Sequence, residues 1–249
     1  MKYKLDKTIL FFLILLLLFS GCTRRTSASE RDNLALAKTE NNSLIYFLPP
    51  PNTEGVLSVE AALANRRSRR HFLNQALTME QLSQILWAAY GITAPIPGHP
   101  ALRGGLRTTP SAGALFPLEI YVVVGNVYGL TAGVYKYISE KHKLVRIIDR
   151  DIRAELSRAA LNQLMVRDAP VTLVYTAVFE RITARYGERG RERYVWIELG
   201  HSAQNVYLQA EALGLGTCAI GAFIDSRVSE LLQLPADERP VYLMPLGFY

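Results

Sequence analysis

The chain has 249 residues, 49% of them hydrophobic, and a formal net charge of +6 at pH 7. That apolar fraction excludes a disordered chain and supplies the core of one ordinary domain. The modest charge requires no polyanionic partner, so nucleic acid is not an expected ligand. With two cysteines, scattered histidines and no CxxC or HExxH motif, the sequence predicts neither a disulfide scaffold nor a metal site.

The first 21 residues have the features of a bacterial lipoprotein signal. Three lysines precede an apolar run from Ile9 to Phe19 that is short for a bilayer span, and a Ser-Gly pair and Cys22 follow it. The pattern predicts cleavage before Cys22, which would then carry lipid and tether an extracytoplasmic protein to a bacterial membrane. A plain N-terminal membrane anchor is the alternative. In either case residues 1–21 stay outside the folded domain.

The next segment, 22–48, is mostly polar and predicts a flexible linker, after which residues 49–249 form the folded domain. Ser58 is placed to act as the N-cap of a first helix. Thr78 opens a second helix through a capping box, and Gly91 ends that helix.

Beyond a loop rich in glycine and proline at 91–113, strands and helices alternate. β-Branched and aromatic runs predict strands at 119–125, 134–138, 144–148 and 171–179. Helical spacing of apolar residues predicts helices at 151–165, 191–213 and 225–234. Interleaved elements without internal repeats indicate an α+β or α/β domain. The helix at 191–213 has bulky apolar residues outside its main stripe, so we expect it in a core or an interface.

The stretch RRSRRHF (66–72) concentrates positive charge around one serine. In an extended segment Arg66, Ser68 and Arg70 would point the same way, and guanidinium and hydroxyl groups at that spacing suit a phosphate monoester. Arg67 and Arg69 would face elsewhere. On spacing alone, a solvated basic surface is the favoured interpretation.

Several ordered stretches resemble the nitroreductase-like flavoproteins, and among them the SagB-type dehydrogenases. They span about residues 49–248 and read RRSRRHF, MEQLSQILWAAYGIT, RTTPSAGALFPLEIYVVV, GVYKY, VFERITARYGERGRERY, ELGHSAQNVYLQAEALGLGTCAIGAF and YLMPLGF. The resemblance implies an α+β fold with a central, mainly antiparallel sheet flanked by helices. It also implies an intertwined homodimer that binds FMN non-covalently at its interface, with the helix at 191–213 in the dimer core.

The same resemblance assigns cofactor-binding residues. Arg66, Ser68 and Arg70 would hold the FMN phosphate and ribityl chain. The small-residue loop of Pro110, Ser111, Ala112 and Gly113 would pack beside the flavin. A second segment, with Ile220 and Gly221, would present backbone amides to the reactive edge of the flavin. Family members usually carry a basic residue after the final glycine, whereas this chain ends Gly247-Phe248-Tyr249. That departure puts FMN affinity in question, and Arg67, Arg69 or an arginine from the partner's 185–193 segment could compensate.

Lys136 and Tyr137 are the candidate catalytic pair, because an adjacent Lys-Tyr pair is assigned to proton removal in the azoline-oxidising branch of the family. Strand alternation favours a different interpretation, an exposed lysine beside a packed tyrosine. Cys218 reads as a small buried residue and His201 as a packed core histidine.

These features predict an FMN-dependent oxidoreductase, lipid-anchored at Cys22, that works in ping-pong fashion on a small-molecule or quinone-like substrate. A thiazoline or oxazoline dehydrogenase acting on a peptide is an alternative. A flavin-binding surface lipoprotein without turnover is another, supported by the missing C-terminal basic residue.

Overall fold

The computed structural model describes residues 37–40 and 43–249. The predicted signal segment 1–21, the lipidation site Cys22 and the first part of the predicted linker lie outside these residues. Among the residues described, none of the helices is long and apolar enough to cross a membrane.

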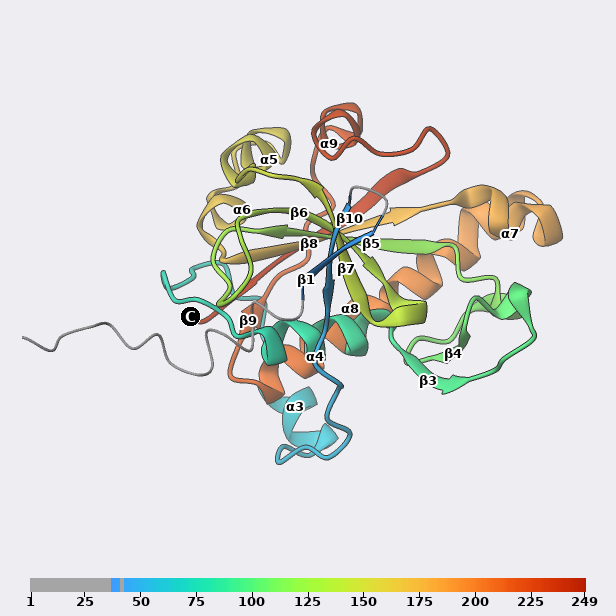
Figure 1. Ribbon diagram of the computed structural model, residues 1–249, viewed down its shortest axis with the longest axis horizontal. Coiled ribbons are helices and arrows are strands. Elements are labelled where there is room, and N and C mark those ends of the chain that lie inside the picture. Colours follow the sequence, from blue (N-terminus) through green and yellow to red (C-terminus); the bar gives the residue numbers. More distant parts are fainter. Residues whose placement is uncertain (1–36, 41–42) are drawn as a thin grey trace, which may run out of the picture. The chain divides into compact units, whose positions relative to one another are not determined.

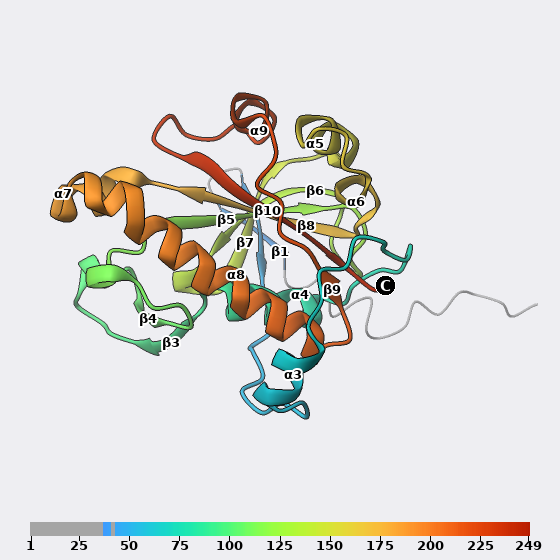
Figure 2. The same cartoon turned by 180° about the vertical axis from the view of Figure 1, so that it is seen from behind.

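The centre of the domain is an antiparallel sheet whose strands are not arranged in chain order (Figures 1 and 2). Within the described residues its strands lie in the order β1 (Ala37–Glu40), β2 (Ser43–Phe47), β7 (Lys143–Ile148), β6 (Gly133–Ile138), β5 (Leu118–Val124), β8 (Val171–Ala177), β10 (Arg239–Gly247) and β9 (Gly216–Thr217). Every pairing between these neighbours is antiparallel. A separate hairpin joins β3 (Ile92–Pro95) to β4 (Gly105–Arg107). The predicted α+β class with a mainly antiparallel sheet is confirmed.

Helices cover both faces of the sheet (Figures 1 and 2). On one face lie α4 (Met79–Tyr90) and α8 (Val195–Ala212), and α3 (Val59–Asn65) packs beside α8. On the other lie α5 (Arg153–Ala159), α6 (Leu164–Asp168) and α9 (Asp225–Leu231). Strands β5 and β8 are buried along their whole length, as their runs of valine and other apolar residues favour when both faces of a sheet are covered.

The predicted helix starts are confirmed. The Ser58 side chain accepts from the backbone of Ala61, and Thr78 forms the full capping box with Gln81. The long predicted helix begins as a π-helical turn, Gly190–Tyr194, and continues as α8. It follows α7 (Phe179–Tyr186).

Three expectations differ from the structure. Strand β2 lies within the segment that we predicted to be linker, because it pairs with β7, which is distant in sequence. The helix expected at 151–165 is divided into α5 and α6, since Leu161 and Asn162 adopt positive φ angles of 56° and 61° that end a right-handed helix. His201 is exposed rather than packed, because Leu199, Ser202 and Ala203 turn toward the core and leave His201 on the opposite side of α8.

Candidate active site

The arginine motif lies against the edge of the sheet. Ser68 pairs in parallel with Thr217 of β9, and the backbone amide of Arg69 donates to the Thr217 carbonyl at 2.9 Å. On one side, the Arg66 guanidinium lies 5.2 Å from the centre of the Tyr207 ring and the Ser68 hydroxyl lies 3.1 Å from the Tyr207 hydroxyl. On the other side, Arg69 lies 4.2 Å from the ring centre of Tyr249. Arg66 and Ser68 thus share one partner, Tyr207, and Arg69 has another, Tyr249, as the predicted alternation requires of these three residues.

None of the arginines at 66, 67, 69 and 70 has a carboxylate partner among residues 37–40 and 43–249. Arg67 folds back and donates to the carbonyls of Ala64 and Arg66. Arg70 is exposed. Positive charge held by rings and carbonyls rather than by acids stays available to an anionic ligand.

The Tyr207 hydroxyl connects this motif to the 217–221 segment, because it accepts from the Ala219 amide at 2.9 Å. We predicted free backbone amides at Ile220 and Gly221. The Ile220 amide instead donates to the Leu243 carbonyl at 2.9 Å, and Ile220 is buried. Gly221 is exposed, with open space around its α-carbon, so only this member of the pair is free to approach a flavin.

The small-residue loop adopts a strained backbone. Gly113, Ala114 and Phe116 have φ angles of 63°, 54° and 47°. A left-handed conformation costs roughly 1–2 kcal/mol for a residue with a β-carbon. At Gly113 a β-carbon would also lie 2.7 Å from the Tyr186 hydroxyl, which explains the glycine. Pro110 and Gly113 are exposed, while Ser111 and Ala112 are half-buried, so the loop offers small groups at the surface.

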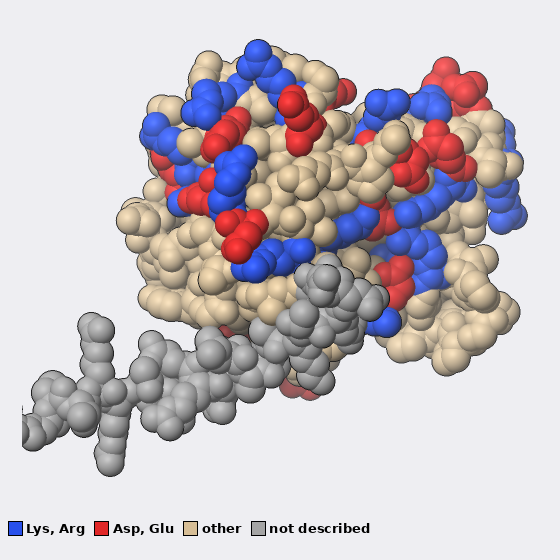
Figure 3. Space-filling model, turned by 45° about the horizontal axis from the view of Figure 1, so that its top comes forward, with Lys and Arg blue, Asp and Glu red and all other residues tan. Residues whose placement is uncertain are grey.

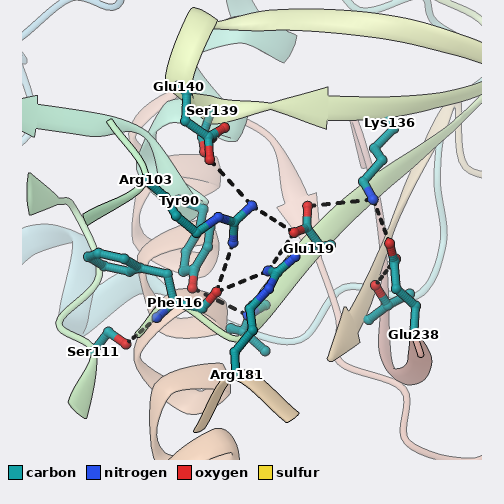
Figure 4. Close-up of polar contacts among 12 residues, drawn as sticks. Tyr90, Arg103, Ser111, Phe116, Glu119, Lys136, Ser139, Glu140, Arg181 and Glu238 are labelled. Carbon is teal, nitrogen blue, oxygen red and sulfur yellow. Dashed lines mark hydrogen bonds and ion pairs between the residues drawn. The ribbon is translucent and has the colours of Figure 1, made fainter. Parts of the chain in front are cut away.

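Polar groups behind the loop hold it in this conformation (Figure 4). The Ser111 hydroxyl accepts from the Phe116 amide at 3.0 Å. The Phe116 carbonyl accepts from Arg103 at 2.9 Å and from Arg181 at 3.2 Å, and both arginines bind Glu119. The buried Phe116 ring packs edge-on against Tyr90.

Beneath the loop lies a buried carboxyl group on α8, Glu198. Tyr90 donates to one of its oxygens, and the other has no hydrogen-bond partner among the described residues. Burial raises the pKa of Glu198 to about 7, although the nearby Ser111 and Tyr90 side chains act in the opposite direction. Burial also lowers the pKa of the neighbouring Arg107, which donates to the Tyr90 carbonyl at 3.2 Å.

The structure does not bring Lys136 and Tyr137 together. The Lys136 ammonium lies 2.5 Å from Glu238 and 3.7 Å from Glu119 on one face of the sheet (Figure 4). Tyr137 points into the core on the other face, where its hydroxyl lies 2.9 Å from Nδ1 of His142. Burial raises the pKa of Tyr137 well above its usual range. These contacts match the packed-tyrosine interpretation, and the lysine is held by acids.

Comparison with known proteins identifies the family. Residues 63–248 match the model of the Nitroreductase family. The chain is a member of the nitroreductase family. A Methanocaldococcus jannaschii protein provisionally named a nitroreductase is 48% identical over 191 residues, which are 77% of this chain and 91% of that protein. The Microcin B17-processing protein McbC of Escherichia coli is 26% identical over 237 residues, 90% of this chain and 82% of McbC.

A crystal structure from Ralstonia eutropha, also provisionally named a nitroreductase, superimposes with a TM-score of 0.67 at 29% identity. The match covers 82% of this chain and 89% of that one. Nitroreductases are generally flavin oxidoreductases. The fold is therefore that of a nitroreductase, and the arginine motif and small-residue loop are the parts to test against a flavin.

Sequence reasoning missed several residues that shape this candidate site. Tyr207, Glu198 and Glu119 all contact the predicted cofactor segments or the groups that hold them. The sequence does point to Glu119 and Glu198, because each interrupts an otherwise apolar run in an element predicted to be buried. No comparable signal marked Tyr207.

Proposed function

We propose that this nitroreductase is an FMN-dependent oxidoreductase. The observation that carries the proposal is the arginine motif, whose positive charges have no acidic partner within the described part of the chain and whose Arg66 and Ser68 converge on Tyr207. A phosphate monoester is the anion that guanidinium and hydroxyl donors at this spacing fit best.

The residues present fit FMN. Arg66, Ser68 and Arg70 would bind the phosphate and ribityl chain, and the free amide of Gly221 would face the ring system. Pro110, Ser111, Ala112 and Gly113 would pack beside the flavin without bulky side chains. The bound flavin would accept and deliver hydride or electrons in two half-reactions, and the protein supplies its position and electrostatic environment. A small-molecule or quinone-like substrate fits the extracytoplasmic, lipid-anchored location that Cys22 predicts.

A second copy of the chain would complete the site as a homodimer. On the side of α8 that faces away from the sheet, Trp196 and Ile197 are 46% and 53% exposed, and Gly200 and His201 lie beside them. The same helix borders a groove of about 340 Å³ with α3 and α4. Large apolar side chains exposed on the central helix are typical of an interface between subunits.

Tyr249 lies against the motif but brings no positive charge to it. The Tyr249 ring stacks with Arg69, and Nε of Arg69 is buried. Arg67 is occupied by backbone carbonyls. We therefore expect Arg66 and Arg70 to supply the phosphate contacts, aided by an arginine of the partner subunit if one is needed.

A peptide azoline dehydrogenase is the second candidate, supported by the similarity to the microcin-processing protein. The contacts of Lys136 weaken it, because its ammonium group binds Glu238 and Glu119 on the face of the sheet opposite the Tyr137 side chain. Flavin reduction by a model thiazoline peptide in the Lys136→Ala protein would separate the two candidates. A rate that depends on Lys136 would favour the azoline reaction.

The primary test is the visible spectrum and FMN titration of the purified lipid-free domain, residues 23–249. We expect a yellow protein with one flavin per subunit and a dimeric mass. Protein that stays colourless with added FMN would contradict both enzyme functions. Tight FMN binding without reduction by any donor would instead favour a flavin-binding lipoprotein.

A further inference from the structure

One buried carboxylate connects the sheet to the strained loop. Glu119 on β5 binds Arg103 at 2.8 Å and Arg181 at 2.6 Å. The arginines come from separate segments, one from the turn before β4 and the other from α7. Each also donates to the Phe116 carbonyl, so a single acid orients two guanidinium groups onto one carbonyl oxygen (Figure 4).

The carbonyl that these arginines hold belongs to a residue with a positive φ angle. Phe116 would relax to a more favourable backbone conformation if its carbonyl were released, and Ala114 shares the same strain. Elsewhere in the loop, Pro110 and Gly113 are exposed to solvent. The arginines therefore fix a loop whose exposed residues are among those proposed to contact the flavin.

Resting on the proposed function, we propose that Glu119 is a positioning residue for the cofactor. Through Arg103 and Arg181 it keeps residues 110–116 in the conformation that receives the flavin ring, although Glu119 itself touches no ligand. This role requires that Glu119 carry its negative charge. Burial alone would raise the pKa of Glu119, but Arg103, Lys136 and Arg181 outweigh burial and keep that pKa below its ordinary value.

The chain contains a matched control for this proposal. Glu238 is equally buried and binds the same Lys136, at 2.5 Å, and it accepts from Thr176 at 2.8 Å. It makes no contact with the two arginines or with the loop in the part of the chain that is described. Replacing either glutamate removes one buried charge from the same cluster, but only Glu119 supports the loop.

The experiment compares Glu119→Gln with Glu238→Gln in the purified dimer. FMN dissociation constants are measured by quenching of flavin fluorescence, and the unfolding temperature of the FMN-free protein is measured beside them. We expect Glu119→Gln to weaken FMN binding about tenfold, since bonds to a charged group are lost around the loop. Glu238→Gln should lower the unfolding temperature comparably and leave the FMN dissociation constant close to that of the wild type.

Equal FMN affinity in Glu119→Gln and the wild type would overturn the proposal, and so would an equal loss in the two variants. If Glu119→Gln fails to fold, Arg181→Lys tests the same link, because lysine keeps the charge but loses the paired donors that reach both Glu119 and the carbonyl. Retained affinity in Arg181→Lys would also contradict the proposal. A wild-type protein that does not bind FMN would refute the proposed function instead, so the two failures are distinguishable.

Discussion

Arginines serve opposite purposes in two regions of this molecule. In the stretch 66–70 they are exposed or half-exposed and have no acidic partner within residues 37–40 and 43–249. Arg66 and Arg69 rest on tyrosine rings, and Arg67 donates to backbone carbonyls. Behind the 110–116 loop, Arg103 and Arg181 are bound to Glu119, and Arg107 reaches Glu140. Paired arginines stabilise the fold, whereas unpaired ones remain free for a ligand. The environment of an arginine, rather than its residue type, indicates its role.

Charged side chains of both signs lie at the surface of the molecule (Figure 3). On the face shown in Figure 3, lysine and arginine side chains lie interspersed with aspartate and glutamate. Such mixing of the two signs on that face limits any long-range field there. The difference between paired and unpaired arginines can therefore be tested by measuring stability and ligand affinity separately.

The largest effect should come from Glu198, in the buried region. Its folded pKa of about 7 lies above the ordinary value of 4.5, so the folded state holds the proton more tightly than the unfolded state. Its contribution is thus complete below about pH 4.5 and is lost as the pH rises through 7. Tyr90, Arg107 and Arg103 are the charged or titratable groups that act on it. Between pH 4.5 and 8 the wild type should lose up to about 3 kcal/mol of unfolding free energy relative to Glu198→Gln.

Urea unfolding of the FMN-free protein at several pH values measures this difference. Glu188→Gln is the control, because Glu188 is 75% exposed on the surface. If the difference in unfolding free energy between the wild type and Glu198→Gln stays constant with pH, folding does not raise the pKa of Glu198 and the prediction is wrong.

Arg181→Met should have the next largest effect. It leaves buried Glu119 with one fewer partner and should lower the free energy of unfolding by about 2 kcal/mol. Arg185 lies on the same helix, α7, is exposed, and has no acidic partner in the described residues. Arg185→Met should therefore change stability by less than about 0.5 kcal/mol. If urea unfolding shows the same loss of unfolding free energy in both variants, paired arginines do not stabilise the fold more than unpaired ones.

Arg66→Ala should leave stability nearly unchanged and weaken FMN binding about tenfold, because it removes a charged donor to the phosphate. Arg67→Ala is its neighbour and control, since Arg67 is directed to backbone carbonyls. Equilibrium dialysis against FMN measures both. If the two substitutions weaken binding equally, the alternation of the motif does not determine which arginines bind.

Gly113→Ala should have the smallest effect, about 1 kcal/mol of stability or FMN binding free energy, because alanine resists a φ of 63°. The added methyl group would also meet the Tyr186 hydroxyl at 2.7 Å. The double variant Gly113→Ala/Tyr186→Phe removes that hydroxyl and should recover part of the loss. If it recovers nothing, backbone strain alone accounts for the glycine.

Local features of the sequence predicted much of the fold. The helix caps at Ser58 and Thr78 and the strands of the central sheet depend on neighbouring residues, whose side chains and backbone dihedrals interact directly. The same holds for the alternating directions of Arg66 and Arg69, which follow from an extended backbone.

Contacts distant in sequence decided the rest. β2 forms because β7 offers it a partner, and the Ile220 amide is used because Leu243 lies opposite it. Glu119 reaches Arg181 only across the fold, and Tyr137 meets His142 away from Lys136. The sequence by itself determined which residues carry charge, strand propensity and caps. Only the tertiary structure decided which arginines are neutralised and which stay free, because the partner of a charge is set by packing between segments far apart in the chain.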